Sequence, residues 1–482
     1  MHRSHTARRV AVAAAVSTLF AGVAVHGQIV AIYSNLAGQA NNSVPTIGGN
    51  FAIGTSSSIA FDRPFVSPDG TRWILGAVQE AGTDDKDIFI VGSGTTGAGA
   101  QTVVVEDAPT VFDSAVLWES LDTRASINNA GQWAVSGNLT GDTAKDEVIV
   151  KFDGTSQIPA VREGDASPIG GELFGSLNDL GDILGNGDLA YRTALSPTTT
   201  KQIAAIGATV VGNTDVTVPL GQLVAPDQSV DNFIAQRFGS SFDGQHYIIR
   251  GDLNGPTTTD DFILYDGRVV IQEGANLPGG VLAGTNVGII SGDAGSQQLS
   301  HNGLWWAART AMADGTGATA TDVVLRNGQL VAKTDDPVVT GSTELWDDAP
   351  FSTTFFLNVL DNNGNMVVGG TTNNADLTKK AILVYVPAAG PGAFILAREG
   401  DPVDVDGNGL FDDDAFISIF GNDDGFLTDS GQYYFVASLR NSAGTDTGNA
   451  FLVLNVPEPT SALALIGAGA LLVGRRRGRS LA

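Results

Sequence analysis

The sequence predicts an all-β protein, a seven-bladed β-propeller built from four-stranded repeats of about 57 residues. A short glycine turn recurs seven times, with its glycine at positions 70, 131, 187, 244, 303, 364 and 431. The intervals are 61, 56, 57, 59, 61 and 67 residues, which indicates a tandem repeat rather than unrelated domains. The 61 glycines and the low content of charged residues, 16%, favour short strands and tight turns over helices.

Each repeat contains apolar runs in the same order. A large apolar pair follows each turn glycine by three and four residues, as in Trp73-Ile74. A second apolar run follows, such as Ile88-Phe89-Ile90. A third run tends to end in an acidic turn that contains Glu163, Glu273 or Glu399. A fourth run is less regular in sequence than the first three. We expect these glutamates to bond backbone amides or to pair with Arg162 and Arg398.

Asp or Asn stands directly before five of the seven turn glycines. We therefore expect two-residue hairpins in which both central residues have positive φ. Trp73, Trp133 and Trp306 occupy strand positions, and we expect them to fill the interior between blades.

The two ends of the repeat region predict a closed ring. After the seventh turn there is a second strand ending at Leu454 and then no third or fourth. We expect the missing strands to come from residues 29–33 and 50–53, because a ring closed in this way has no exposed sheet edge. Another all-β repeat is the alternative, although this period is long for a β-solenoid and short for a string of β-sandwiches.

Residues 1–27 have the pattern of a signal peptide with a helical apolar core. Arg3, Arg8 and Arg9 form a basic start, and residues 10–25 are almost wholly small and apolar. We expect signal peptidase to cut between Gly27 and Gln28; an uncleaved membrane anchor is the alternative.

Composition limits the partners. Cysteine is absent, so an exported chain must be stabilised by packing, or by packing with a metal. The repeat region, residues 28–455, carries 19 basic and 51 acidic residues, a net charge of −32. Such a surface repels nucleic acid and attracts divalent cations.

The last segment, residues 456–482, combines three features in order: Pro457, Glu458 and Pro459, then an apolar stretch over 461–474, then Arg475, Arg476 and Arg477. The apolar stretch is short for a membrane span, and the arginines would stay on the cytoplasmic side. This order resembles the PEP-CTERM sorting signal. The resemblance implies a transient inner-membrane stage with a short transmembrane helix, recognition of the Pro-Glu-Pro motif by an exosortase, and delivery to the cell surface, outer envelope or extracellular matrix. A permanent tail anchor is the alternative.

The repeat itself also resembles a known family. Gly131-Gln132-Trp133-Ala134-Val135 with Asn128, and Gly187-Asp188-Leu189-Ala190-Tyr191, are similar to the Asn-x-x-Gly-x-x-Ala-Phe tandem repeat of choice-of-anchor proteins. The leading asparagine is present only as Asn128, and the alanine occurs only in the second and third copies. That family implies export but no particular activity.

One acidic loop is a candidate calcium site. Its oxygen-bearing positions follow the spacing of an EF-hand loop, with a sharp turn at Gly409. The expected ligands are Asp404, Asp406, Asn408, the carbonyl of Leu410, and Asp412. The twelfth position is Ala415 instead of glutamate, so Asp413 or Asp414 would have to complete the shell. A structural Ca²⁺ is expected, and an acidic, glycine-rich loop without a metal is the alternative.

Catalytic signals are weak. The sequence has no nucleophile elbow, phosphate loop or paired metal-ligand histidines. His246 and His301 lie beside successive turns, where exposed side chains are the usual outcome. We therefore expect a non-catalytic binding or scaffold propeller, with extracellular polysaccharide as a partner suggested by location. A secreted carbohydrate-active hydrolase or lyase is the alternative, to be recognised by one deep pocket with converging polar groups.

Overall fold

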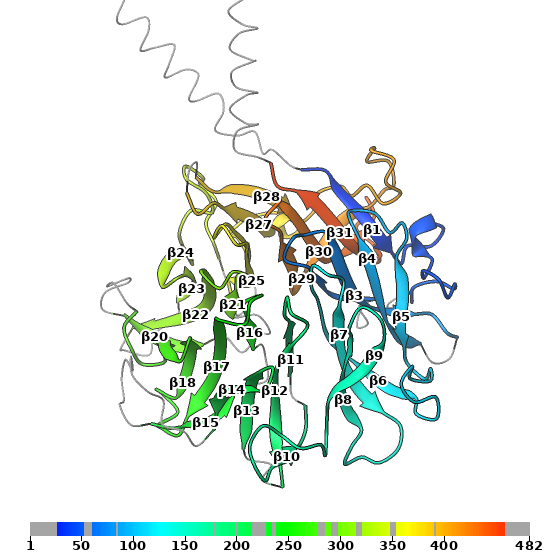
Figure 1. Cartoon of the computed structure of the whole chain (residues 1–482). Coiled ribbons are helices and arrows are strands. Elements are labelled where there is room, and N and C mark those ends of the chain that lie inside the picture. The colour runs from blue at the N-terminus through cyan, green and yellow to red at the C-terminus, as the bar shows by residue number, and fades with distance from the viewer. Residues whose placement is uncertain are drawn as a thin grey trace, which may run out of the picture.

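The computed structural model describes residues 27–52, 60–82, 85–177, 179–197, 201–214, 228–233, 238–277, 285–290, 297–314, 321–347, 353–389 and 392–457. The described strands form seven sheets, which confirms the predicted all-β, seven-bladed propeller (Figure 1). In these ranges the helical elements are two single 3-10 turns, η1 (Ala40–Asn42) and η3 (Leu377–Lys379). No helix in the described part is long and apolar enough to cross a membrane. The predicted signal helix and the apolar stretch 461–474 lie outside it.

Each blade is an antiparallel sheet whose first strand lies nearest the axis, and we number the blades 1 to 7 from β2 onward. The innermost strands, three of them split in two, are β2 (Phe61–Val66), β6 (Trp118–Ile127), β10 (Leu173–Phe174) with β11 (Asp179–Ile183), β15 (Val230–Phe233) with β16 (Gly239–Ser240), β20 (Thr285–Ile290) with β21 (Gln297–Leu299), β25 (Phe355–Leu360) and β29 (Phe416–Leu427). These strands contact one another around the ring, and β29 contacts β2.

The outer strands follow in chain order, except in blade 7, whose outermost strand is the first strand of the chain. The second strands are β3 (Arg72–Gln79), β7 (Trp133–Leu139), β12 (Leu189–Ser196), β17 (Tyr247–Leu253), β22 (Trp306–Asp314), β26 (Met366–Thr371) and β30 (Gln432–Arg440). The third strands are β4 (Lys86–Ser93), β8 (Glu147–Phe152), β13 (Gln202–Ile206), β18 (Asp261–Tyr265), β23 (Thr321–Arg326), β27 (Ala381–Val386) and β31 (Asp446–Asn455). The outermost strands are β5 (Gln101–Val105), β9 (Gln157–Arg162), β14 (Thr209–Asn213), β19 (Arg268–Gln272), β24 (Gln329–Lys333), β28 (Phe394–Arg398) and β1 (Ile29–Ser34).

The first strand of the chain closes the last blade. β1 pairs with β31 in antiparallel register, with Ile29 opposite Leu454. This confirms the predicted use of residues 29–33, but the prediction for residues 50–53 is wrong. Blade 7 has the order β1-β31-β30-β29 and takes only one strand from the start of the chain, whereas Asn50 and Phe51 form only isolated bridges. Phe51 is instead a core residue, fully buried with its ring 4.8 Å from that of Phe61.

The buried apolar side chains of the described residues form seven clusters, each between two neighbouring blades, and one of them joins blade 7 to blade 1. Trp73, Trp133 and Trp306 are all buried in these clusters, as predicted. Because every blade shares its apolar side chains with both neighbours, stability depends on the ring being closed.

The glycine turns differ from the predicted type. All seven turn glycines have positive φ, between 70° and 82°, but the residue before each glycine does not. In blade 1 the amide of Gly70 donates to the carbonyl of Ser67 (2.8 Å), and the amide of Ser67 donates to the carbonyl of Arg72 (2.8 Å). This is a longer loop with a single left-handed residue, so the expectation of two-residue hairpins is wrong.

The Asp and Asn side chains of these turns have another role, because they join one blade to the next. The amide of Asp69 donates to Oδ1 of Asn129 (3.0 Å), that of Asn302 to Oδ1 of Asn362 (2.6 Å), and that of Asn362 to Oδ1 of Asp429 (2.8 Å). We call the end of the propeller that carries the seven glycine turns the turn face.

Candidate functional site

The acidic loop lies between β28 and β29 and is attached to β1. The amide of Asp404 donates to the carbonyl of Ile29, and the amide of Ala31 donates to the carbonyl of Asp404, both at 3.0 Å. The side chain of Gln28 donates to Oδ2 of Asp404 (2.8 Å). The loop is therefore packed on the strand that closes the ring, although Asp404 is far from β1 in sequence.

The loop brings together three carboxylates. One oxygen each of Asp404, Asp406 and Asp413 lies within 4.8 Å of the others. Asp404 is 1% exposed, and its oxygens accept hydrogen bonds from the amides of Asn408 (3.1 Å) and Gly409 (2.9 Å). Oxygen ligands at such spacing suit Ca²⁺.

The other predicted ligands lie in the same loop. The amide group of Asn408 donates to Asp406 (2.9 Å) and to Asp412 (3.3 Å), while its oxygen accepts from the amide of Leu410. Among the carboxylates, the structure gathers Asp404 and Asp406 with Asp413, one of the two residues expected to complete the shell. Ligation by Asn408, the carbonyl of Leu410 and Asp412 stays a prediction.

A second candidate site is a cavity of about 80 Å³ on the propeller axis. We call it the axial cavity; its lining includes Arg63, Arg124, Asp182, Gln298, His301 and Phe426. These residues come from the innermost strands of blades 1, 2, 3, 5 and 7 or directly follow them. Of these residues, only His301 was named from the sequence as a candidate site residue. Arg63 and Arg124 carried a signal that was not used, since both stand seven residues before a turn glycine.

The two histidines have different surroundings. Nδ1 of His246 lies 2.7 Å from Oδ2 of Asp266. His301 lines the axial cavity, with its ring centroid 5.3 Å from that of Phe426. Burial lowers the pKa of His301 to about 4, against the opposing effect of Asp429. His301 is therefore neutral near pH 7 and is not the exposed turn histidine expected from the sequence.

Three buried arginines recur at equivalent positions in the second strands of blades 3, 4 and 5: Arg192, Arg250 and Arg309. Arg309 donates to the carbonyl of Phe355 in blade 6 (3.0 Å) and forms an ion pair with Asp423 in blade 7 (2.5 Å). It therefore links three consecutive blades. Its sequence signal, an arginine five or six residues after a turn glycine inside an apolar run, was missed.

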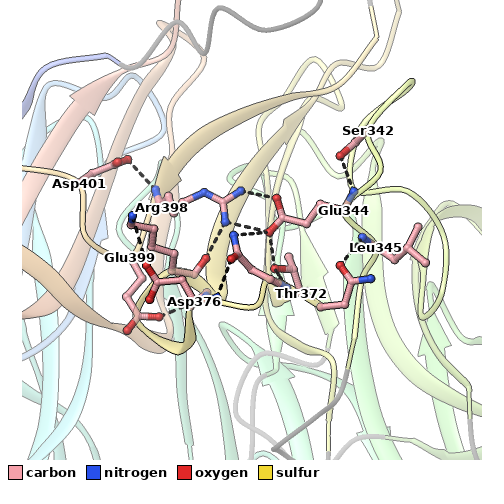
Figure 2. A network of polar contacts seen from close by, with 12 residues as sticks. Ser342, Glu344, Leu345, Thr372, Asp376, Arg398, Glu399 and Asp401 are labelled. Atoms are coloured by element: carbon pink, nitrogen blue, oxygen red, sulfur yellow. Dashed lines mark hydrogen bonds and ion pairs between the residues drawn. The ribbon is translucent and has the colours of Figure 1, made fainter.

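A polar network joins the loop before β25 to the outer strands of blade 6 (Figure 2). Arg398 donates to both oxygens of Glu344, at 2.9 and 2.7 Å. Burial acts to raise the pKa of Glu344, but hydrogen bonds from Arg398 and Thr372 outweigh it and hold the pKa below its ordinary value. Arg398 thus pairs with Glu344 and not with Glu399. Glu399 instead accepts a hydrogen bond from the backbone amide of Ala381 (3.3 Å), which was the other role expected for it from the sequence.

Other carboxylates lie close to like charges. Burial and the neighbouring Glu147 raise the pKa of Glu163 to about 7. Burial and a hydrogen bond with Asp261 raise the pKa of Asp252 to about 7. Burial, and after it the negative charge of Asp261, raise the pKa of Glu273 to about 7. This is far above the pKa of an ordinary carboxyl.

These raised pKa values predict that stability falls as the pH rises. A carboxyl with a raised folded-state pKa keeps a proton that the unfolded chain has lost, so its stabilising contribution is complete below about pH 4 and is lost as the pH passes about 7. We expect a lower unfolding temperature at about pH 8 than at about pH 5, because these three carboxyls outweigh His301, whose lowered pKa acts in the opposite direction. The double variant Glu163→Gln/Asp252→Asn should show a smaller difference in unfolding temperature between about pH 5 and about pH 8. The control Glu119→Gln, which changes an exposed acid, should show the same difference as the parent chain. An unfolding temperature that rises with pH would contradict the prediction.

The two predicted processing sites lie beside the same strand pair. Gly27 packs on the carbonyl of Asn455, where an added Cβ would lie 2.5 Å from the oxygen. The amide of Val456 donates to the carbonyl of the turn glycine Gly431 (2.7 Å), and Pro457 follows directly. Both chain ends therefore leave the propeller at the turn face. Glu458, Pro459 and Arg475, Arg476 and Arg477 lie outside the described residues.

The fold and the chain end together define a propeller protein with a C-terminal sorting segment. The model of the PEP-CTERM protein-sorting motif matches residues 455–479. The motif implies an exported protein that is processed by an exosortase and sorted to the cell surface.

The other comparisons show only distant likeness. No curated protein matches the chain. The polysaccharide lyase Uly1 is similar at 10% identity and a TM-score of 0.42, over 90% of this chain and 100% of that one. A protein of unknown function from Dyadobacter fermentans has 10% identity and a TM-score of 0.31, over 90% and 98%. Prolyl oligopeptidase B from Galerina marginata has 10% identity and a TM-score of 0.34, over 83% and 50%. At this distance no activity is transferred from them.

Proposed function

We propose that this chain is a non-catalytic binding or scaffold propeller that an exosortase delivers to the cell surface or extracellular matrix, where it contacts polysaccharide. The observation that carries the proposal is that the sorting motif starts at Asn455, the last residue of β31. The propeller is thus the cargo that the motif delivers. Membership of the repeats in the choice-of-anchor group, removal of residues 1–27 by signal peptidase and a transient membrane stage of the tail belong to the same proposal.

The size of the axial cavity favours binding over catalysis. Small-molecule sites usually have roughly 300–1,000 Å³, whereas this cavity has about 80 Å³. A cavity below this range is small for the sugar subsites of a hydrolase or lyase. Cells that lack the chain should therefore lose matrix or surface polysaccharide contact without losing a polysaccharide-cleaving activity, which binding of labelled polysaccharide to intact cells and an assay of released sugar ends would measure.

One observation supports the rival, a carbohydrate-active hydrolase or lyase. Arg63, Arg124, Asp182 and His301 converge with aromatic rings on one central cavity, which is the composition expected of an active site. Release of unsaturated or reducing ends from uronate-containing polysaccharide by the full chain, abolished in His301→Gln, would establish the enzyme and overturn the non-catalytic proposal.

Structural calcium at the acidic loop is part of the proposal. Because Asp404, Asp406 and Asp413 repel one another and the loop is bonded to β1, a cation there would strengthen closure of the ring. Saturating Ca²⁺ should raise the unfolding temperature of the full chain by about 2–5 °C. Asp413→Asn should abolish this rise, and the matched variant Asp412→Asn should keep it. Equal unfolding temperatures with Ca²⁺ and with a chelator would show that the loop is acidic but binds no structural calcium.

The short junction between propeller and sorting motif predicts slow processing. Asn455 still pairs with Gln432, and Val456 is bonded to Gly431, so the first residues of the matched segment, just before Pro457, must leave the sheet to become an extended protease substrate. A flexible spacer of about six residues after Asn455 should speed removal of the tail, because it frees the motif from the sheet. Pulse-chase immunoblots measure the rate, and the same spacer after Gly141, in an exposed loop, is the control. An unchanged rate would contradict the prediction.

A further inference from the structure

The axial cavity has a positive formal charge inside a strongly acidic protein. Arg63 and Arg124 contribute two positive charges to its lining, and Asp182 contributes one negative charge. Asp182 is engaged, because its Oδ2 accepts from the amide of Ser240 at 3.0 Å. The repeat region as a whole carries −32, so a cationic cavity on its axis is contrary to the charge of the rest of the molecule.

The cavity lining also carries unused donors. In the described part of the chain, Nε of Arg63 and Nε2 of Gln298 are buried and have no hydrogen-bond partner. Both atoms are obligate donors, and leaving a buried donor unsatisfied is unfavourable. The Arg63 guanidinium is held over the ring of Phe65, with Cζ 5.2 Å from the ring centroid. Each of these donors can take an acceptor, and an anionic acceptor best matches the charge of the lining.

The innermost strands explain why these side chains reach the axis. The ladder between β2 and β3 is irregular between Phe61 and Pro64, and the one between β6 and β7 is irregular between Leu121 and Ala125. Arg63 and Arg124 lie in these irregular segments. A bulge re-aims side chains that would otherwise alternate between the two faces of a blade. The arginines are thus built into the inner wall and do not extend from surface loops.

We propose that the axial cavity binds one oxyanion group, a carboxylate or a sulfate, with Arg63 and Gln298 as its donors and with Arg124, which already has a partner, adding positive charge to the lining. By the volume one water requires, about 80 Å³ has room for roughly five to eight waters, which is enough for a carboxylate or a sulfate. This inference deepens the proposed function. If the oxyanion belongs to an acidic polysaccharide, the inference rests on polysaccharide being the partner. A free oxyanion would bind whether or not polysaccharide is the partner.

The test is titration calorimetry of the full chain in detergent with sodium sulfate, sodium acetate and a galacturonate oligomer, and with a neutral glucose oligomer for comparison. Arg63→Met should weaken anion binding about tenfold or more, because a charge-assisted hydrogen bond is lost. Gln298→Met tests the second donor should Arg63→Met fail to fold. Arg268→Met, the same change at an exposed arginine of β19, is the matched control and should bind as the parent does.

Each result is decisive. Binding of sulfate or acetate that weakens in Arg63→Met or Gln298→Met but not in Arg268→Met supports the site, and binding of the galacturonate oligomer alone with the same pattern assigns the group to a polysaccharide. No anion binding, or binding that the cavity variants leave unchanged, overturns the inference. That outcome would not bear on export and sorting, whereas a chain that binds anions but stays unprocessed in cells would count against the proposed function alone.

Discussion

Replacing Arg309 with methionine is expected to lower the free energy of unfolding by about 3–5 kcal/mol, the range for breaking a buried ion pair by removing one partner. Arg309 and Asp423 are 2% exposed each, and their ion pair is 2.5 Å long. The change removes the cation beside the buried carboxylate and also a donor to the carbonyl of Phe355. Denaturant unfolding, followed by two probes to check for a single transition, measures the loss.

The double variant Arg309→Met/Asp423→Asn distinguishes a lost charge pair from lost packing. Because asparagine tolerates the positive φ of 57° at this position, the second change removes the stranded charge without adding backbone strain. We expect it to recover part of the loss. If Arg309→Met were as stable as Arg268→Met, the ion pair would not be holding blades 5, 6 and 7 together.

The sequence was sufficient for the architecture because the features that define a blade are local. Turn glycines and apolar runs reflect backbone and strand chemistry within about 60 residues, so their period predicted the number of blades. The turn type was wrong because the residue before the glycine does not adopt positive φ. In blade 1 the side chain of Asp69 instead accepts hydrogen bonds inside its own, longer turn, from Ser67 and Thr71. Residues 50–53 were misplaced because a buried Phe51 has the apolar character of a strand residue.

The candidate sites were harder to predict because their parts are distant in sequence. Three members of the axial cavity, Arg63, Asp182 and Gln298, come from three blades, and only ring closure places them together. The acidic loop was visible as a local pattern, but its attachment to β1 joins residues more than 370 positions apart. The local pattern did offer Asp413 as one of two residues that could complete the shell, and the structure places Asp413 beside Asp404 and Asp406.

Replacing Ile29–Ser34 with a glycine and serine segment of equal length is expected to open the ring. Ile29, Ile32 and Tyr33 are 2%, 2% and 4% exposed, and burial of three such side chains contributes about 5–9 kcal/mol. This is comparable to the whole stability of a typical domain, about 5–15 kcal/mol. The variant would also expose the edge of β31, so it should associate on size-exclusion chromatography and be cut rapidly by added protease. The same replacement of the exposed residues 141–144 should change neither property, and a β1 variant that stays monomeric and protease-resistant would show that the ring does not depend on this strand.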